Sequence, residues 1–359
     1  MATIGTIIND DTQALKYCNE SLQICGTETD SMITRTQVLQ LRGTLYRKAG
    51  SFDKGLTQYK KALKNITTPH VRKLKRLRAE INSQIAYLYL SHFMHLKEGK
   101  KAEKYAYEAL KILDATDTYS IGEKELPSHF TWETGRHRWK YAQVQLFHFN
   151  NFKKAYQDLQ EALYIVEKTS PHNMFIKGRI LGTMGITLLR LKNYKEAEKI
   201  LSDSINLTST VLGKTAAWPQ HVRRAEARIK LGDLSGAYED CLAVHKQAET
   251  EKNKMLVLDY WKATYHAGVI NCKMHKYTEA IVYFETFVKR MKNFCSTFLS
   301  AENMKQLEGA GTFNHPTAQT LSNKEMAREY LKKSHIILEA IYGAHHPFID
   351  AYVRENTLL

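Results

Sequence analysis

The amino-acid sequence predicts an all-α fold, a right-handed superhelical solenoid of about seven helical hairpins. Only 6 prolines and 18 glycines occur in 359 residues, so few helix breakers interrupt the chain. Lys and Gln recur through long segments, and both favour helices over strands. A pattern of small and large side chains also returns several times along the chain, which is typical of stacked repeats.

The repeated pattern is clearest in residues 39–62. It predicts a first helix around Gly43, a turn at Gly50 and a second helix around Tyr59, with small residues where the two helices cross. Large residues three or four positions away would fill the groove between neighbouring hairpins. A seventh copy keeps only its second helix, around Ala327. The other copies lie at residues 86–109, 139–162, 181–201, 225–241 and 268–284.

These spacings resemble the tetratricopeptide repeat, in which each repeat is a pair of helices. Equivalent small residues lie about 40 to 53 positions apart. This is longer than the usual period of roughly 34, and it is similar to the kinesin-light-chain type of the repeat. Residues 208–222 and 338–353 look like the leucine–glycine–x–x–histidine–proline link of that type. The second keeps it as His346-Pro347, whereas the first has Trp218-Pro219. The resemblance covers nearly the whole chain and implies a fold, not a partner.

The domain organisation predicted from the repeats is one solenoid over residues 1–359. Residues 115–136 are expected to form a long connecting loop. The half-hairpins at both ends leave two interpretations open, a piece of a longer protein or a chain capped by half-hairpins. The predicted parts are a half-hairpin at 10–26, six hairpins over 36–295, an irregular connection at 296–323, and the last hairpin helix with a C-terminal half-hairpin at 324–359.

The charge balance favours anionic partners. The net charge is +15 and the pI is near 9.4, and residues 41–104 alone hold sixteen Lys/Arg against four Asp/Glu. An acidic protein, a nucleic acid or an anionic membrane is therefore favoured over a basic partner. Five scattered cysteines without metal-ligand spacing predict free thiols of a reducing, cytoplasmic compartment. No apolar run reaches the roughly 18 residues that span a bilayer.

Motifs that carry common enzymatic chemistry are absent from the sequence. None of the fifteen histidines lies in an HExxH pattern, and no Cys/His cluster has zinc spacing. The sequence also has no glycine-rich phosphate loop, nucleophile elbow or dinucleotide fingerprint. We therefore expect no catalytic residue, no metal site and no cofactor.

The tetratricopeptide resemblance implies a concave groove that binds a peptide or helix and is lined by the first helix of each hairpin. Cationic and aromatic groups there suit an acidic segment, because Arg pairs with carboxylates through two hydrogen bonds. Val144 stands where the Asn of the family's two-carboxylate clamp would fall, so that clamp is incomplete. The predicted ligand is an acidic peptide or helix, and the predicted role is that of a non-catalytic scaffold. The groove positions are Lys140, Arg179, Arg223, Lys262 and Tyr265, with Gln40 and Tyr87 in similar places earlier.

A basic run at residues 70–78 supports an alternative. Leu74, Leu77 and Ile81 repeat at three and four, so the run is predicted to be helical with one apolar stripe. Five positive charges at a helix start oppose the helix dipole, which stability alone would not favour. The alternative function is a regulator that binds nucleic acid or docks on an anionic membrane; a solvated convex face is equally compatible with the run. The basic patch consists of Arg72, Lys73, Lys75, Arg76 and Arg78.

Overall fold

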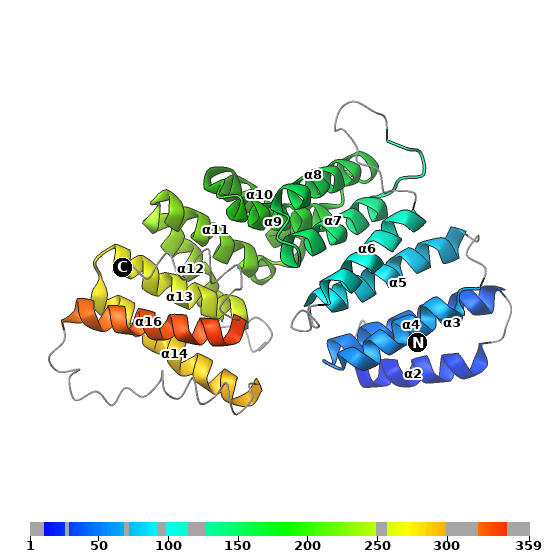
Figure 1. The fold of residues 1–359 in the computed structure, drawn as a ribbon, viewed down its shortest axis with the longest axis horizontal. Coiled ribbons are helices and arrows are strands. Elements are labelled where there is room, and N and C mark those ends of the chain that lie inside the picture. The colour runs from blue at the N-terminus through cyan, green and yellow to red at the C-terminus, as the bar shows by residue number, and fades with distance from the viewer. Residues whose placement is uncertain are drawn as a thin grey trace. The chain divides into compact units, whose positions relative to one another are not determined.

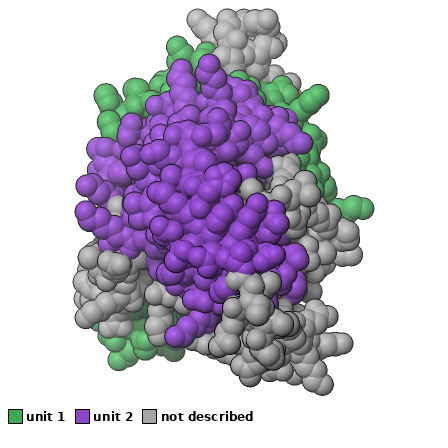
Figure 2. All heavy atoms as spheres, turned by 90° about the vertical axis from the view of Figure 1, so that its left-hand side faces the viewer, with its two compact units in different colours: residues 1–183 green, residues 184–359 purple. Residues whose placement is uncertain are grey.

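The computed structural model describes residues 11–25, 29–67, 72–91, 98–113, 126–248, 257–298 and 322–342. These residues form fourteen α-helices and one short 3-10 helix, and they contain no strand (Figure 1). The predicted all-α class is therefore confirmed. The chain divides into two compact units, residues 1–183 and 184–359, which Figure 2 colours separately. The boundary falls within helix α9 (Met174–Arg190), and one solenoid across both units stays a prediction.

Unit 1 is a series of helical hairpins preceded by a single helix. Helix α2 packs against α3, and each first helix packs against the second helix of its own hairpin. First helices of successive hairpins also touch, because α5 contacts both α3 and α7. This arrangement brings residues from several first helices to one surface. The helices are α2 (Asp11–Ile24), α3 (Thr29–Lys48), α4 (Phe52–Asn65), α5 (Arg72–Ser91), α6 (Gly99–Ile112), α7 (Trp132–Phe147) and α8 (Phe152–Thr169).

Unit 2 begins within α9 and shows the same pairing of helices, with Gly185 of α9 against Leu201 of α10. The last described helix, α16, packs against both α14 and α13. A first helix packs in this way on both helices of the preceding hairpin. The sequence, in contrast, predicts a second helix around Ala327. The link predicted at residues 208–222 contains Pro219, which lies in the first turn of α11, where the missing N–H of proline is tolerated. The remaining elements are α10 (Tyr194–Leu212), η2 (Lys214–Ala217), α11 (Trp218–Leu231), α12 (Leu234–Ala248), α13 (Val257–Lys273), α14 (Tyr277–Phe298) and α16 (Asn323–Tyr342).

Glycines let the two helices of a hairpin approach closely, as the repeat predicts. A Cβ added at Gly43 would lie 2.6 Å from the ring of Tyr59 on the second helix. At Gly135 the obstacle is backbone, because the added Cβ would lie 2.7 Å from the carbonyl oxygen of Ala162. Such contacts fix the crossing point of each pair. Two further close approaches, Gly185 to Leu201 and Gly268 to Phe284, place added Cβ atoms at 2.4 and 2.5 Å.

The turns inside the hairpins share one backbone device. In each of five hairpins a residue with positive φ precedes the second helix by two positions, and the next backbone N–H donates to a carbonyl of the last helical turn. This is the left-handed helix ending that satisfies orphan carbonyl groups. Only two of the five are glycine, so glycine spacing alone does not locate these turns. The residues are Gly50, Asn150, Lys192, Gly232 and His275.

The predicted loop at 115–136 is wrong at its end. Helix α7 begins at Trp132, so the last five residues of that range are helical. Thr131 is extended, and its backbone N–H donates to Thr134 Oγ1 at 3.3 Å, which starts the helix. Gly135 lies within α7 and lets that helix approach the backbone of α8 closely. Of the predicted irregular connection at 296–323, residues 296–298 belong to α14 and residue 323 begins α16. Residues 299–321 and 343–359, with His346-Pro347, lie outside the described residues.

Candidate functional site

Four successive first helices line one cleft in unit 1. Its volume is about 450 Å³, and every residue that lines it lies before the unit boundary. We call it the Trp139 cleft. On α7 the lining positions recur at intervals of three and four, so they form one face of that helix. The lining residues are Arg47 of α3, Gln84 and Tyr87 of α5, Trp132, Arg136, Trp139, Lys140 and Gln143 of α7, and Phe175, Ile176 and Arg179 of α9.

Positive charge dominates the Trp139 cleft. Four cations line it, namely Arg47, Arg136, Lys140 and Arg179. The carboxylate of Glu80 on α5 is close to two of them: it accepts a short hydrogen bond from Arg136 Nη2, and it lies 4.0 Å from Lys140 Nζ. Among the described residues, the four cations that line the cleft thus share one neighbouring carboxylate, which contacts two of them. Excess like charge at a partly buried site favours binding of an anion.

Three guanidinium groups of the cleft stack on aromatic rings. The distance from the arginine Cζ to the ring centroid is 5.4 Å for Arg47 over Tyr87, 5.3 Å for Arg136 over Trp132 and 5.8 Å for Arg179 over Trp139. A ring beneath a guanidinium stabilises its charge while leaving the N–H edge available for a ligand. The Trp139 indole is itself fixed, because Nε1 donates to Thr183 Oγ1 at 2.8 Å.

Burial destabilises the charge on Lys140. Its side chain is only 13% exposed, and burial, reinforced by the guanidinium groups of Arg136, Arg47 and Arg179, lowers its pKa from 10.5 to about 8 although Glu80 acts in the opposite direction. Burial also opposes ionisation of Glu80, yet Lys140 and Arg136 hold the Glu80 pKa below its usual value. Both groups are therefore charged at neutral pH, and the lysine carries its charge at a cost in stability.

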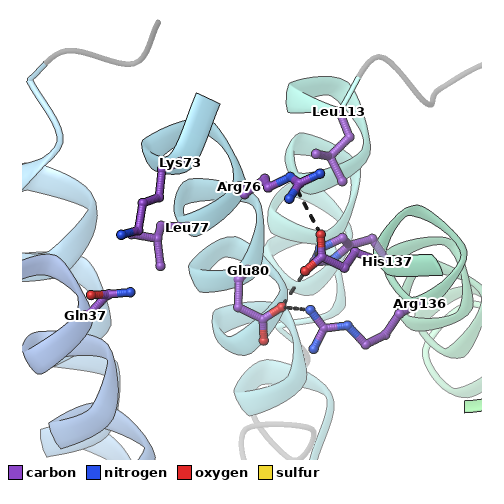
Figure 3. Close-up of a pocket in the computed structure, with 9 residues that line it drawn as sticks. Gln37, Lys73, Arg76, Leu77, Glu80, Leu113, Arg136 and His137 are labelled. Atoms are coloured by element: carbon purple, nitrogen blue, oxygen red, sulfur yellow. Dashed lines mark hydrogen bonds and ion pairs between the residues drawn. The ribbon is translucent and has the colours of Figure 1, made fainter. Parts of the chain in front are cut away.

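A second, smaller pocket meets the Trp139 cleft at Arg136 (Figure 3). Its volume is about 190 Å³. Figure 3 shows Glu80 directed at Arg136 and His137 across the space between α5 and α7. His137 is buried and its Nδ1 contacts Ser83 Oγ, and burial lowers its pKa to about 3, so it stays neutral. The lining residues are Gln37, Lys73, Arg76, Leu77, Glu80, Leu113, Glu133, Arg136 and His137.

The basic run contributes to this second pocket. Helix α5 begins at Arg72 and buries Leu74, as the apolar stripe predicts. Lys73, Arg76 and Arg78 are exposed, and Lys75 is half-buried. Arg76 Nε lies 3.8 Å from a carboxylate oxygen of Glu133 on α7. The side chain of Arg72 is outside the described part.

The structure separates the predicted groove residues into two groups. Lys140 and Arg179 line the Trp139 cleft together with Tyr87. Arg223 and Lys262 lie in unit 2, where burial, reinforced by Arg223, lowers the Lys262 pKa to about 7. Gln40 does not line the Trp139 cleft.

In unit 2 the Arg223 neighbourhood is an ion-pair network. Glu226 accepts a hydrogen bond from Arg223 at 3.0 Å and lies 3.7 Å from Arg190, so it neutralises part of this positive charge. The other two arginines of the 223–228 run bind Asp240. These ion pairs give the three arginines at 223–228 a structural role within unit 2.

Tyr265 is a wrong prediction. It is 0% exposed in the unit 2 core, and its hydroxyl hydrogen-bonds His335 Nε2 of α16 at 2.8 Å. The register places it on the groove face, but α16 packs over that part of α13 and removes it from solvent. Tyr265 therefore contributes to packing and cannot line a groove.

Metal and membrane features do not emerge from the described ranges. Within them, no group of three or more His, Cys, Asp or Glu side chains is placed to hold a metal ion. Among the same residues, no helix combines the length and the apolarity that crossing a bilayer requires.

Comparison with known proteins identifies the fold. No family model matches the sequence, and curated proteins give no match. Among solved structures, the apo form of RapI aligns with a TM-score of 0.53 and 14% identity over 93% of this chain and 82% of its own. A tetratricopeptide repeat protein from Parabacteroides merdae gives 0.50 and 16% over 93% and 95%.

A third similar structure is a STAND signal-transduction ATPase with a tetratricopeptide repeat sensor from Pyrococcus horikoshii. It gives a TM-score of 0.52 and 14% identity over 99% of this chain and 45% of that protein. These similarities confirm the tetratricopeptide-type helical repeat predicted from the sequence. At such identities they establish the fold, and the function is argued from the site.

Proposed function

We propose that this protein is a non-catalytic interaction module that holds an acidic peptide or helix in the Trp139 cleft. The carrying observation is the convergence of four cations on the first helices of successive hairpins, which the carboxylate of Glu80 neutralises only in part. Repeat proteins of this kind bind ligands along surfaces to which each repeat contributes a few side chains. The ligand would be recognised by charge and by shape, with the repeats as a rigid support.

The walls of the cleft favour a peptide over a bare ion. Trp132, Trp139 and Ile176 are largely covered, while Phe175 at the start of α9 is 41% exposed. Apolar walls with a few directed polar groups are typical of ligand sites that bury the body of a ligand. An acidic residue followed by an apolar one would satisfy both the cations and the rings.

The histidine and the serine beside the cleft do not meet its ligand. His137 is buried with a pKa of about 3, and the Ser83 hydroxyl beside it is fully buried. Lys140 lines the cleft and has a pKa of about 8, and we assign it to charge pairing with the ligand. The free thiols of Cys18, Cys241 and Cys272 agree with a reducing, cytoplasmic compartment.

The experiment is a binding titration with a fluorescent degenerate peptide library that carries two adjacent glutamates at its centre. The native chain is compared with Arg179→Glu, a reversal at an exposed cleft residue, and with the matched control Arg35→Glu at an exposed site of α3. We expect Arg179→Glu to weaken binding at least about tenfold, equivalent to about 1.4 kcal/mol, and Arg35→Glu to change it little. If both variants lose the same peptide affinity while their helical circular dichroism is intact, net charge alone explains the loss. That result would refute the Trp139 cleft as the binding site.

The basic patch supports a second candidate, a nucleic-acid or anionic-membrane contact. The observation that favours it is the exposure of Lys73, Arg76 and Arg78 at the first turns of α5. This candidate predicts that the chain binds duplex RNA or phosphatidylserine vesicles. The logarithm of the binding constant should fall linearly with the logarithm of the salt concentration. Arg78→Glu should weaken that binding and leave peptide binding unchanged. If Arg78→Glu leaves the RNA or vesicle binding unchanged, the basic patch is not the binding site.

A further inference from the structure

The number of cations in the Trp139 cleft exceeds what one carboxylate can balance. With Glu80 counted, four positive charges face one negative charge, which leaves an excess of three. A side-chain carboxylate brings one charge and leaves two uncompensated. A phosphomonoester brings about −1.5 to −2 at pH 7 and leaves roughly one. The electrostatic gain is therefore larger for the phosphoryl group.

The donors in the cleft also outnumber the oxygens of a carboxylate. Arg47, Arg136 and Arg179 each carry a guanidinium fork whose face is occupied by an aromatic ring, and Arg136 shares its donors with Glu80. A carboxylate has two oxygens to accept such forks, whereas a phosphoryl group has three, arranged around phosphorus. Lys140 adds an ammonium, which serves as a compact charge for either ligand.

The free cleft leaves some of these donors unsatisfied. The Nε atoms of Arg47 and Arg136 are buried, and within the described part they have no hydrogen-bond partner. Burial, reinforced by the guanidinium groups of Arg136, Arg47 and Arg179, lowers the pKa of Lys140 beside these donors. Buried cationic groups in this condition are stabilised when an anion of high charge arrives.

We propose that the anionic group recognised by the Trp139 cleft is a phosphorylated side chain of a peptide. This deepens the proposed function, on which it rests, and it names the anchor of the ligand. The forks of Arg47, Arg136 and Arg179 bind the phosphoryl oxygens, and Lys140 adds charge. The apolar walls at Phe175 and Ile176 hold a neighbouring residue of the same peptide.

The test uses three degenerate peptide libraries on the full chain, identical except for serine, glutamate or phosphoserine at the centre. Binding is followed by anisotropy of the label, with inorganic phosphate as a competitor and Arg35→Gln as the control for one lost charge. We expect phosphoserine peptides to bind at least about tenfold more tightly than glutamate peptides, and serine peptides not to bind. Arg179→Gln should remove most of the preference, and Arg35→Gln should keep it.

Each other outcome overturns a defined part of the proposal. Equal affinity for glutamate and phosphoserine libraries refutes the phosphoryl anchor and leaves the acidic-peptide function standing. Inorganic phosphate that binds as tightly as the phosphopeptides shows a small-anion site and refutes the peptide source. If no library binds the native chain, the proposed function itself fails. A preference that survives Arg179→Gln places the phosphoryl group elsewhere.

Discussion

Replacing Lys140 with methionine tests whether the cleft keeps a charge at the expense of stability. Burial and the neighbouring guanidinium groups lower the Lys140 pKa from 10.5 to about 8. That difference corresponds to about 3 kcal/mol by which the charged lysine destabilises the folded state at pH 7. Methionine keeps the aliphatic stem and removes the charge. The variant should therefore be more stable than the native chain at pH 7, by up to about 3 kcal/mol.

The pH dependence gives the sign of the effect. Between pH 8 and pH 10.5 the unfolded chain keeps the proton on Lys140 while the folded chain has released it. The unfolded state then binds more protons, so the stability of the native chain rises with pH in this window. The gain reaches about 2 kcal/mol by pH 9.5, and Lys140→Met has no such gain. Its advantage over the native chain should shrink from about 3 to about 1 kcal/mol.

The assay is urea unfolding at pH 7 and pH 9.5, followed by tryptophan fluorescence that includes Trp132 and Trp139. Other groups titrate alike in both proteins, so the comparison isolates Lys140. Lys140→Arg serves as the control that stays charged throughout, and it should fall behind the native chain at pH 9.5. A methionine variant less stable than the native chain at pH 7, or a difference independent of pH, would refute the reasoning. A charge kept at this cost is expected of a ligand-binding residue.

Further changes test other parts of the structure. Glu80→Gln removes the internal competitor for the cations, so peptide affinity should rise about threefold or more, measured by anisotropy against the exposed control Glu20→Gln. Arg138→Met removes the cation beside the buried carboxylate of Glu161 and leaves buried Asp158 with Lys154 alone, and it should lower the free energy of unfolding by about 3 to 5 kcal/mol; a loss under 1 kcal/mol would contradict this. Tyr265→Phe removes the hydroxyl bonded to His335 and should cost about 1 kcal/mol without changing peptide affinity. Gly135→Ala meets a backbone carbonyl and should destabilise by about 1 to 3 kcal/mol in thermal unfolding.

Part of the site was visible in the sequence. Lys140, Arg179 and Tyr87 sit at groove positions of their hairpins, and they do meet in one cleft. Arg136 lies in the range predicted as a connecting loop, whereas the structure places it in α7, where Gly135 permits close packing against α8.

Other members of the site carried no separate signal. Trp132 precedes the predicted start of the helix, and Phe175 stands in a segment that the repeat pattern leaves unassigned. Glu80 follows the basic run and reads as one acidic residue of a solvated helix. Its role emerges only because α5 and α7 lie side by side and bring its carboxylate to Arg136.

The sequence by itself determined the helical class, the hairpins and the face of each first helix, because these follow from local spacing. Gly43 against Tyr59 is such a case, since the two lie within one hairpin. Tertiary structure decided which faces stay open. Tyr265 has the register of a groove residue, yet His335, distant in the sequence, covers it. Periodicity fixes the direction in which a side chain points, whereas its exposure depends on which distant helix packs against that face.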